Sequence, residues 1–260
     1  MDKVIAKKKF GQNFLKDKNI KNAIVESANI TPNEIIVEIG PGTGAITSLI
    51  LQNNVKLIAY EIDNDLASRL EKQFKNDNFT LINKDVLECE FPKQKFKVIA
   101  NIPYYITSDI LFKLFDNYKN ISLAIIMMQK EVADRLIAKE NTANYSKLTM
   151  VNNIYCETQK LFDVPNFAFE PAPKVTSSVV KMTFKNNIEP NHFKIRKFIA
   201  NCFRFRRKFL TKNLENIYKK EEVMQALSSL KLNINSRAQE LSLETIIKLM
   251  KILERSNNDN

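Results

Sequence analysis

The stretch Val37-Glu38-Ile39-Gly40-Pro41-Gly42-Thr43-Gly44 decides the fold that this sequence predicts. It holds three of the chain's four glycines, so the backbone here is expected to turn tightly and lie close to something else. The apolar residues 35–37 predict a short buried strand before the glycines, and residues 45–51 predict a helix after them. A strand, a glycine loop and a helix N-terminus together present backbone N–H groups to a nucleotide-like ligand.

The spacing of the glycines distinguishes this loop from the dinucleotide-binding motif. The third glycine comes one residue too early for G-x-G-x-x-G. An acidic residue, Glu38, placed two positions before G-x-G-x-G resembles the S-adenosylmethionine (SAM) loop of Rossmann-like methyltransferases. Taken alone, the loop leaves open a glycine turn in another kind of α/β protein.

Strand and helix patterns alternate after the glycine loop. Strands are predicted at 55–61, 79–83, 96–100 and 121–128, and helices at 63–76, 107–117, 130–139 and 145–155. Residues 175–184 predict a late, antiparallel strand. The alternation predicts an α/β fold with a mostly parallel sheet and helices on both faces.

Charge and composition divide the chain into two expected domains. Residues 1–22 carry seven Lys or Arg against two acids, residues 23–185 carry eighteen against nineteen, and residues 186–260 carry fifteen against eight. A near-neutral body with basic ends favours binding of a polyanion. We expect a Rossmann-like domain over 1–187, with a basic lid segment at 1–18, and a small all-helical domain over 188–260.

Other features narrow the class of protein. No apolar stretch reaches the roughly 18 residues of a membrane span, and no secretory signal is visible, which predicts a cytoplasmic protein. Three separated cysteines favour reduced thiols over disulfides or zinc. With only one histidine, His192, we expect no metal site and assign that residue to a domain junction.

Acidic residues follow two of the predicted strands. Glu61 lies 21 residues after Gly40, the distance at which a carboxylate accepts hydrogen bonds from ribose hydroxyls. Asp85 follows the next strand and could accept a hydrogen bond from an adenine amino group, while Val86 packs on the ring. Either acid alone could instead be a helix N-cap. Together with the glycine loop, which includes Gly42, they predict a cofactor site at the carboxyl edge of the sheet.

The next strand ends in Asn101-Ile102-Pro103-Tyr104-Tyr105, the most specific signal in the chain. The exocyclic nitrogen of adenine is a poor nucleophile, because its lone pair is delocalised into the ring. The Asn101 side-chain oxygen and a backbone carbonyl of Ile102 or Pro103 could accept hydrogen bonds from that NH₂ and localise the lone pair, while Tyr104 stacks on the base. No strong general base is then needed. We expect Phe169 to hold the far face of the base.

Four stretches identify a family: Gly11-Gln-Asn-Phe-Leu15, Glu38 to Gly44, Asn101 to Tyr105, and Phe169-Glu-Pro-Ala-Pro-Lys-Val175. In this order and spacing they resemble the ribosomal RNA adenine N6,N6-dimethyltransferases of the KsgA/RsmA type over about residues 7–255. The resemblance implies a seven-stranded class I fold and a substrate of two adjacent adenosines in the 3′-terminal hairpin of 16S rRNA, in a partly assembled 30S subunit. The residues that it implies for SAM are Asn13, Leu15, Gly40, Glu61, Asp85 and Asn101.

The related Erm-type enzymes, which methylate 23S rRNA and confer macrolide resistance, share the SAM loop and the Asn-x-Pro-Tyr motif. The stretch from Phe203 to Leu214 instead resembles the R-R-K-x-L-x-x-N-L signature of the small-subunit enzymes. A solvated basic helix face, and a non-catalytic RNA-binding assembly factor, remain alternatives. We expect a monomer that binds rRNA phosphates through Lys7, Lys8, Lys9, Arg204, Arg206, Arg207, Lys208 and Lys212.

Overall fold

The computed structural model describes residues 6–258, and the chain divides into two compact units. The first unit comprises residues 1–133 and 156–186, and the second comprises residues 134–155 and 187–260. The C-terminal stretch of the second unit thus begins at Asn187, directly before the expected boundary. Residues 134–155, however, belong to the helical unit and not to the expected first domain. The Tyr145 hydroxyl anchors this segment there by donating to the Leu241 carbonyl over 3.2 Å.

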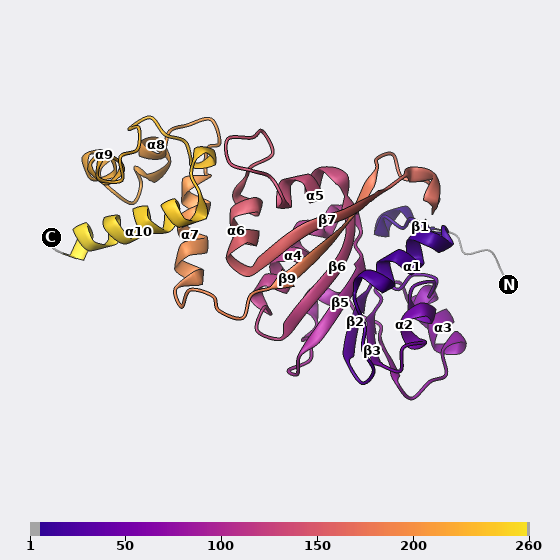
Figure 1. Cartoon of the computed structure of the whole chain (residues 1–260). Coiled ribbons are helices and arrows are strands. Elements are labelled where there is room, and N and C mark those ends of the chain that lie inside the picture. The colour runs from indigo at the N-terminus through magenta and orange to yellow at the C-terminus, as the bar shows by residue number, and fades with distance from the viewer. Residues whose placement is uncertain (1–5, 259–260) are drawn as a thin grey trace. The chain divides into compact units, whose positions relative to one another are not determined.

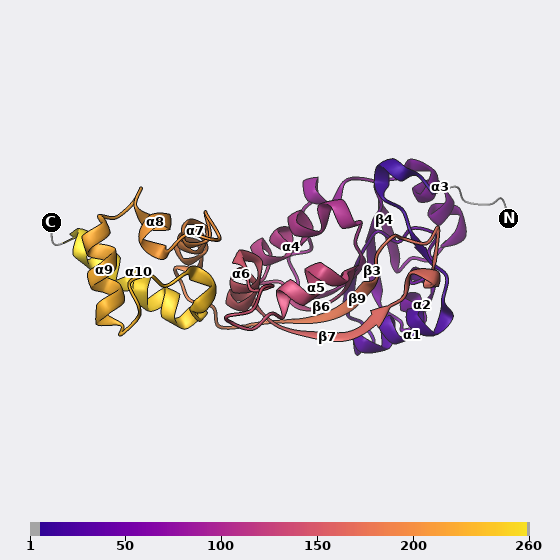
Figure 2. The same cartoon turned by 90° about the horizontal axis from the view of Figure 1, so that it is seen from above.

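A seven-stranded sheet forms the first unit, in the order β4-β3-β2-β5-β6-β9-β7 (Figures 1 and 2). The first five strands of that order are parallel, and β9 runs antiparallel to both β6 and β7. This confirms the predicted mostly parallel sheet and its late antiparallel strand. The strands are β2 (Ile35–Ile39), β3 (Lys56–Tyr60), β4 (Phe79–Ile82), β5 (Phe96–Asn101), β6 (Ile121–Gln129), β7 (Cys156–Val164) and β9 (Ser177–Phe184).

The sequence analysis missed β7. Only its end residues Cys156 and Val164 are buried, and the residues between them are exposed or half-buried, as expected of an edge strand that contains no long apolar run. Four α-helices accompany the sheet within the first unit: α1 (Lys18–Ser27), α2 (Thr47–Leu51), α3 (Asn64–Gln73) and α4 (Thr107–Asp116). A further helix, α5 (Lys130–Leu136), begins in the first unit and ends in the second.

Side chains alternate between the two faces of the sheet along each strand, and apolar residues are buried on both faces. On one face, Ile36, Leu57 and Ile125 belong to a core cluster that includes residues of α1 and α2. Those two helices lie side by side (Figures 1 and 2). Val37 and Ile126, which alternation places on the opposite face, are also fully buried.

A second, two-stranded sheet brings the N-terminal segment to the body of the first unit. It pairs β1 (Phe14–Leu15) with β8 (Phe169–Glu170) in antiparallel register. Before β1, a short 3₁₀ helix spans Lys8–Phe10. The expected basic lid segment is therefore a folded part of this unit over its described residues.

The second unit is helical, as expected of the C-terminal region. Its helices are α6 (Lys147–Tyr155), α7 (His192–Cys202), α8 (Leu210–Leu214), α9 (Lys220–Ser229) and α10 (Leu243–Asn258). His192 is buried at the start of α7, where its Nδ1 lies 3.1 Å from the Tyr155 hydroxyl. Among the described residues, no helix has both the length and the apolar character that a membrane crossing requires.

Candidate active site

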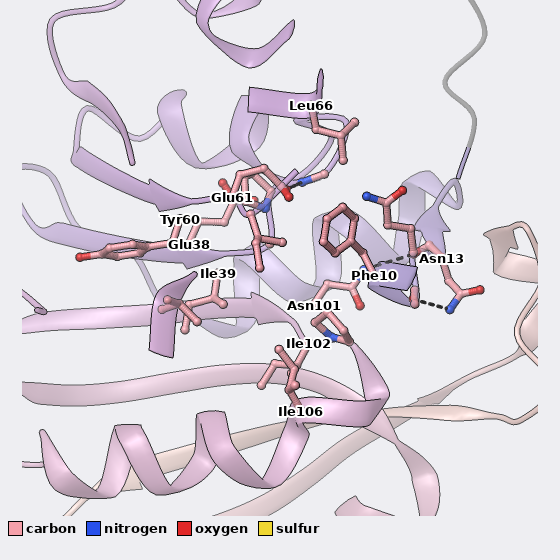
Figure 3. Close-up of a pocket in the computed structure, with 18 of the residues that line it drawn as sticks. Phe10, Asn13, Glu38, Ile39, Tyr60, Glu61, Leu66, Asn101, Ile102 and Ile106 are labelled. Carbon is pink, nitrogen blue, oxygen red and sulfur yellow. Dashed lines mark hydrogen bonds between the residues drawn. The ribbon is translucent and has the colours of Figure 1, made fainter. Parts of the chain in front are cut away.

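A cavity lies at the carboxyl ends of β2, β3 and β5, where ligands bind in open α/β sheets. Its lining combines residues of the N-terminal segment with the loops that follow these strands, and Figure 3 shows Phe10, Glu61 and Asn101 around it. Most of the residues predicted for cofactor and base line it, namely Asn13, Leu15, Gly40, Gly42, Glu61, Asp85, Val86, Asn101, Ile102, Pro103, Tyr104 and Tyr105.

The glycine loop follows β2, and its backbone shape requires glycine. Gly40 has φ +72°, and a Cβ there would lie 3.2 Å from the Asn101 carbonyl oxygen. Gly44 has φ +78°, and a Cβ there would lie 2.5 Å from the Phe74 ring. Side chains are strained at such φ values. The glycines therefore let the loop pass close to the end of β5 and to the helix that follows β3.

Glu61 ties the glycine loop to the end of β3. One carboxylate oxygen accepts from the Gly42 N–H over 3.1 Å, and the other accepts from the Asp63 N–H over 3.0 Å. Only 5% of Glu61 is exposed. Burial raises the pKa of Glu61, and the two backbone N–H groups oppose that rise. The carboxyl group is thus held in place by the backbone on both sides of it.

Glu38 is a second buried acid on the cavity wall. It is 2% exposed, and one oxygen accepts from the Thr47 hydroxyl over 2.7 Å. Burial raises the pKa of Glu38 to about 8, opposed by the Thr47 hydrogen bond and assisted by the charge of Glu61. Glu38 is therefore protonated at neutral pH, whereas a solvated glutamic acid would be ionised.

Asp85 and Val86 take the positions that the sequence predicts. Asp85 caps a 3₁₀ helix over Val86–Glu88 by accepting from the Leu87 N–H over 2.9 Å, and it also lines the cavity. The N-cap and ligand interpretations are thus compatible, because a carboxylate has a second oxygen and further lone pairs. Val86 is buried and offers the cavity an apolar surface.

Asn101 ends β5, and its amide nitrogen faces the Asn13 carbonyl oxygen at 3.5 Å. This contact leaves the Asn101 side-chain oxygen as an acceptor. The Pro103 carbonyl accepts from the Ile106 N–H at 3.3 Å and from the Thr107 hydroxyl at 3.3 Å. Since the Pro103 carbonyl accepts from a backbone N–H and shares the Thr107 hydroxyl proton with the Tyr104 carbonyl, the carbonyl of Ile102 is the better candidate for the second acceptor.

The two tyrosines of this motif differ in their surroundings. Tyr104 is half-buried, and its hydroxyl lies 2.6 Å from the Ser177 hydroxyl. Tyr105 is exposed and lies against Gly11, where a Cβ would be 3.3 Å from its ring. The two rings therefore lie in different places: Tyr104 is held at the sheet, and Tyr105 lies beside the N-terminal segment.

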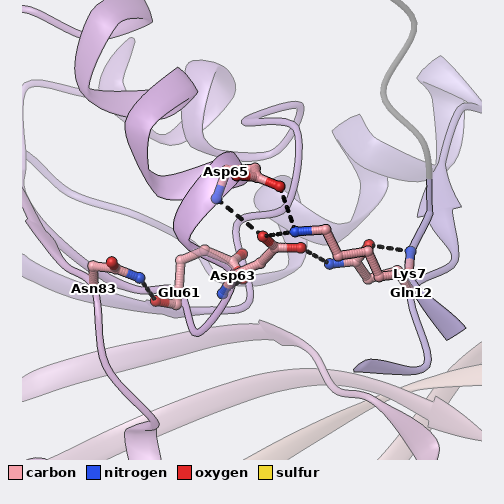
Figure 4. Close-up of polar contacts among 6 residues, drawn as sticks. All are labelled: Lys7, Gln12, Glu61, Asp63, Asp65 and Asn83. Carbon is pink, nitrogen blue, oxygen red and sulfur yellow. Dashed lines mark hydrogen bonds and ion pairs between the residues drawn. The ribbon is translucent and has the colours of Figure 1, made fainter. Parts of the chain in front are cut away.

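The N-terminal segment is held over the cavity by a polar network (Figure 4). Lys7 Nζ pairs with Asp63 at 2.6 Å and with Asp65 at 2.5 Å, and the Gln12 amide donates to Asp63 over 2.8 Å. These contacts correct the prediction for Lys7: its ammonium group is engaged by two carboxylates and is not free for RNA phosphates. Lys9 is exposed, and the side chain of Lys8 lies outside the described region of the chain.

The structure also corrects the prediction for Phe169. Its pairing opposite Leu15 places it in the core cluster, where it is 2% exposed, and it does not line the cavity. Phe167, two residues earlier in the chain, is instead 69% exposed. Spacing could not distinguish the two rings, because the pairing of β1 with β8 decides which one is buried.

The basic residues of the second unit lie mainly on a loop and not on the face of a helix. The loop joins α7 to α8 and exposes the side chains of Arg204, Arg206, Arg207 and Lys208. Asn213 closes it, accepting from the Phe205 N–H and donating to the carbonyls of Phe205 and Lys208. Lys212, on α8, pairs with Glu215 at 2.6 Å.

Sequence reasoning overlooked several cavity residues. Phe10, Gln12, Ile62 and Lys84 line the cavity together with the predicted set. The position of Ile62, directly after the acidic residue that follows β3, is a signal that could have identified it as an apolar contact. Gln12 lies within the stretch from Gly11 to Leu15, which was already a signal. Phe10 and Lys84 follow from tertiary folding, since no local pattern distinguishes them from surface residues.

Comparisons with known proteins agree on one family. The profile of the ribosomal RNA adenine dimethylases matches residues 4–255. The chain is 46% identical to a ribosomal RNA small subunit methyltransferase A of Mycoplasma mobile, over 91% of this chain and 94% of that protein. It is 45% identical to the protein of the same name from Metamycoplasma arthritidis, over 98% of this chain and 99% of that protein.

Solved structures support the same assignment. A dimethyladenosine transferase from Plasmodium falciparum has a TM-score of 0.83 and 28% identity, covering 94% of this chain and 98% of its own. The 23S rRNA methyltransferase ErmE has a TM-score of 0.73 and 25% identity, covering 93% of this chain and 100% of its own. The predicted class I methyltransferase fold is therefore confirmed, and the chain belongs to the ribosomal RNA adenine dimethylase family.

Proposed function

We propose that this enzyme transfers methyl groups from SAM to N6 of two adjacent adenosines in the 3′-terminal hairpin of 16S rRNA, during assembly of the 30S subunit. The observation that carries the proposal is the convergence of the glycine loop, Glu61 and Asn101 to Tyr104 on one cavity. The small-subunit name of its relatives at 46% and 45% identity favours this substrate over the 23S rRNA of ErmE.

The cavity fits SAM by the chemistry of its lining. The Glu61 carboxylate is suited to the ribose hydroxyls, and Asp85 with Val86 to the adenine ring. The glycine loop lets the backbone approach the cofactor where a Cβ would strain it. When bound, SAM supplies an activated methyl group on a sulfonium. The remaining cofactor contacts that we propose are Asn13, Leu15, Gly40, Gly42 and Asn101.

The chain's own residues then prepare the target nitrogen. The Asn101 side-chain oxygen and the carbonyl of Ile102 accept hydrogen bonds from the adenine NH₂, which favours a pyramidal nitrogen with its lone pair directed at the methyl group. Pro103 fixes the turn that follows these two residues, and the Tyr104 ring stacks on the base. The nitrogen becomes acidic once it is alkylated, so solvent can take the proton and no strong general base is required.

Binding of the RNA requires a cationic surface and a base turned out of its stack. The loop between α7 and α8 supplies exposed positive charge for phosphates through Arg204, Arg206, Arg207 and Lys208. Lys9 adds an exposed cation on the N-terminal segment. We assign the enzyme to the cytoplasm, where ribosomal subunits assemble, and we propose that it acts as a monomer.

The test is methyl transfer from labelled SAM to small subunits that lack the hairpin modification, with large subunits in parallel. Nuclease digestion and mass spectrometry locate the label. We expect dimethyladenosine at two adjacent small-subunit positions. Label confined to large-subunit RNA would move the enzyme to the Erm-type alternative. No label on either subunit, with SAM still bound, would favour a non-catalytic assembly factor.

A further inference from the structure

The hydroxyls of Tyr104 and Ser177 lie 2.6 Å apart, although 73 residues separate them in the chain. Ser177 is fully buried and begins β9. It pairs with Gln129 of β6 on one side and with Val164 of β7 on the other. The ladders on both sides fix its backbone, so its Cβ is a rigid point in the sheet.

Tyr104, in contrast, stands on a turn. It begins a short 3₁₀ helix over Tyr104–Ile106 that follows Pro103, and its side chain lines the cavity. The Thr107 hydroxyl lies 3.2 Å from the Tyr104 carbonyl, which holds the backbone of the turn. Without a contact at its far end, the ring could still rotate about its side-chain bonds. The backbone of the turn holds the Cβ of Tyr104, and the bond to Ser177 restrains the far end of the ring at its Oη.

The protonation state of Tyr104 is compatible with this contact. Burial raises the pKa of Tyr104, and the hydrogen bond with Ser177 opposes the rise. The phenol therefore stays neutral at physiological pH and keeps a proton to share with the serine. Ser178, the next residue, is also buried but bonds to Asp163 over 2.6 Å. The two adjacent serines thus have separate partners.

We infer that Ser177 is a positioning residue, which holds the Tyr104 ring in the orientation that stacks on the target adenine. This inference rests on the proposed function, in which Tyr104 contacts the base. It assigns to the late antiparallel strand a role in methyl transfer, although Ser177 does not line the cavity itself. A ring that is fixed before the base arrives loses less conformational freedom on binding.

The experiment is a double-mutant cycle on methyl transfer in single turnover at saturating SAM and small subunits. The variants are Ser177→Ala, Tyr104→Phe and their combination. Tyr104→Ala removes the whole ring, and Ser178→Ala is the matched control. Each of the first two removes one hydroxyl of the same bond. The affinity for S-adenosylhomocysteine and the unfolding midpoint in urea are measured for every variant, to separate positioning from cofactor binding and stability.

We expect Ser177→Ala and Tyr104→Phe each to slow methyl transfer about fivefold, the size of one neutral hydrogen bond. The combined variant should be no slower than the slower single variant, since both remove the same interaction. Cofactor affinity should be unchanged, and Ser178→Ala should transfer methyl groups at the normal rate. If Ser177→Ala fails to fold, Tyr104→Phe tests the same bond from the loop side.

Two results would overturn the inference while leaving the proposed function intact. The first is a normal rate of methyl transfer in Ser177→Ala while Tyr104→Ala is inactive. If Ser177→Ala does not fold, a normal rate in Tyr104→Phe has the same meaning. The other is a combined variant whose loss is the product of the two single losses, because the residues would then act independently. Full activity in Tyr104→Ala would instead contradict the role of the ring in the proposed function.

Discussion

Replacement of Glu38 by glutamine should make the stability of the enzyme less dependent on pH. Glu38 is 2% exposed, and burial raises its pKa from 4.5 to about 8. Because the folded pKa lies above the unfolded one, the folded state binds the extra proton between these values. The stability from this group is fully present below pH 4.5 and is lost as pH rises to about 8.

The size of the effect follows from the two pKa values. Inside the window, the free energy of unfolding falls by about 1.4 kcal/mol per pH unit from this group alone. Between pH 5.5 and 7.5 this amounts to about 2.5 kcal/mol, since titration near the upper value reduces the slope. Glu38→Gln carries no charge and keeps an oxygen for the Thr47 hydroxyl, so it should not show this loss.

The assay is urea unfolding of both proteins at pH 5.5, 6.5 and 7.5, and the quantity compared is their difference in the free energy of unfolding. Taking the difference cancels the pH-dependent contributions to the free energy of unfolding from the titratable groups that the two proteins share. We expect the variant to gain about 2.5 kcal/mol relative to the natural protein from the lowest to the highest pH. A difference that stays constant over this range would refute a protonated Glu38.

Glu34→Gln is the matched control, because Glu34 directly precedes the same strand. Burial opposes ionisation there, but hydrogen bonds from Lys97 and Thr31 lower the pKa of Glu34 below its usual 4.5. Its contribution is present above that value and is lost only in acid. The difference between Glu34→Gln and the natural protein should therefore be flat from pH 5.5 to 7.5.

Three further predictions concern the active site and the RNA surface. Asn101→Ala should slow methyl transfer at least about a hundredfold while S-adenosylhomocysteine binding stays measurable by calorimetry; normal turnover would contradict its role as acceptor. Charge reversal of Arg206 and Arg207 should weaken subunit binding and lower its logarithmic salt slope by about two, without changing cofactor affinity; an unchanged slope would argue against phosphate contacts. Lys7→Met should speed cofactor dissociation measured by stopped flow, whereas Lys9→Met should not. Equal dissociation rates in the two variants would show that the ion pairs of Lys7 with Asp63 and Asp65 do not hold the N-terminal segment over the cavity.

Much of the cavity lining could be predicted from the sequence. Gly40, Glu61, Asp85 and Asn101 each follow a strand with a clear apolar pattern, and parallel strands end at one edge of a sheet. Their meeting in one cavity therefore follows from local patterns and one general rule. The sequence also placed β9 correctly, because its alternation and the prolines before it are local features.

The predictions that failed depend on which distant segments pack together. The choice between Phe167 and Phe169 follows from the pairing of β1 with β8. The engagement of Lys7 by Asp63 and Asp65 joins positions 56 and 58 residues apart. Neither contact has a signature in the residues around it.

The sequence by itself thus determined the α/β fold, the family and the residues at the strand ends, since periodicity, glycine spacing and motif order are properties of neighbouring residues. Tertiary structure alone decided which aromatic ring is buried, how the N-terminal segment is held and that Ser177 fixes Tyr104. The physical reason is that such contacts depend on side-chain packing and on hydrogen bonds between segments that meet only when the chain folds.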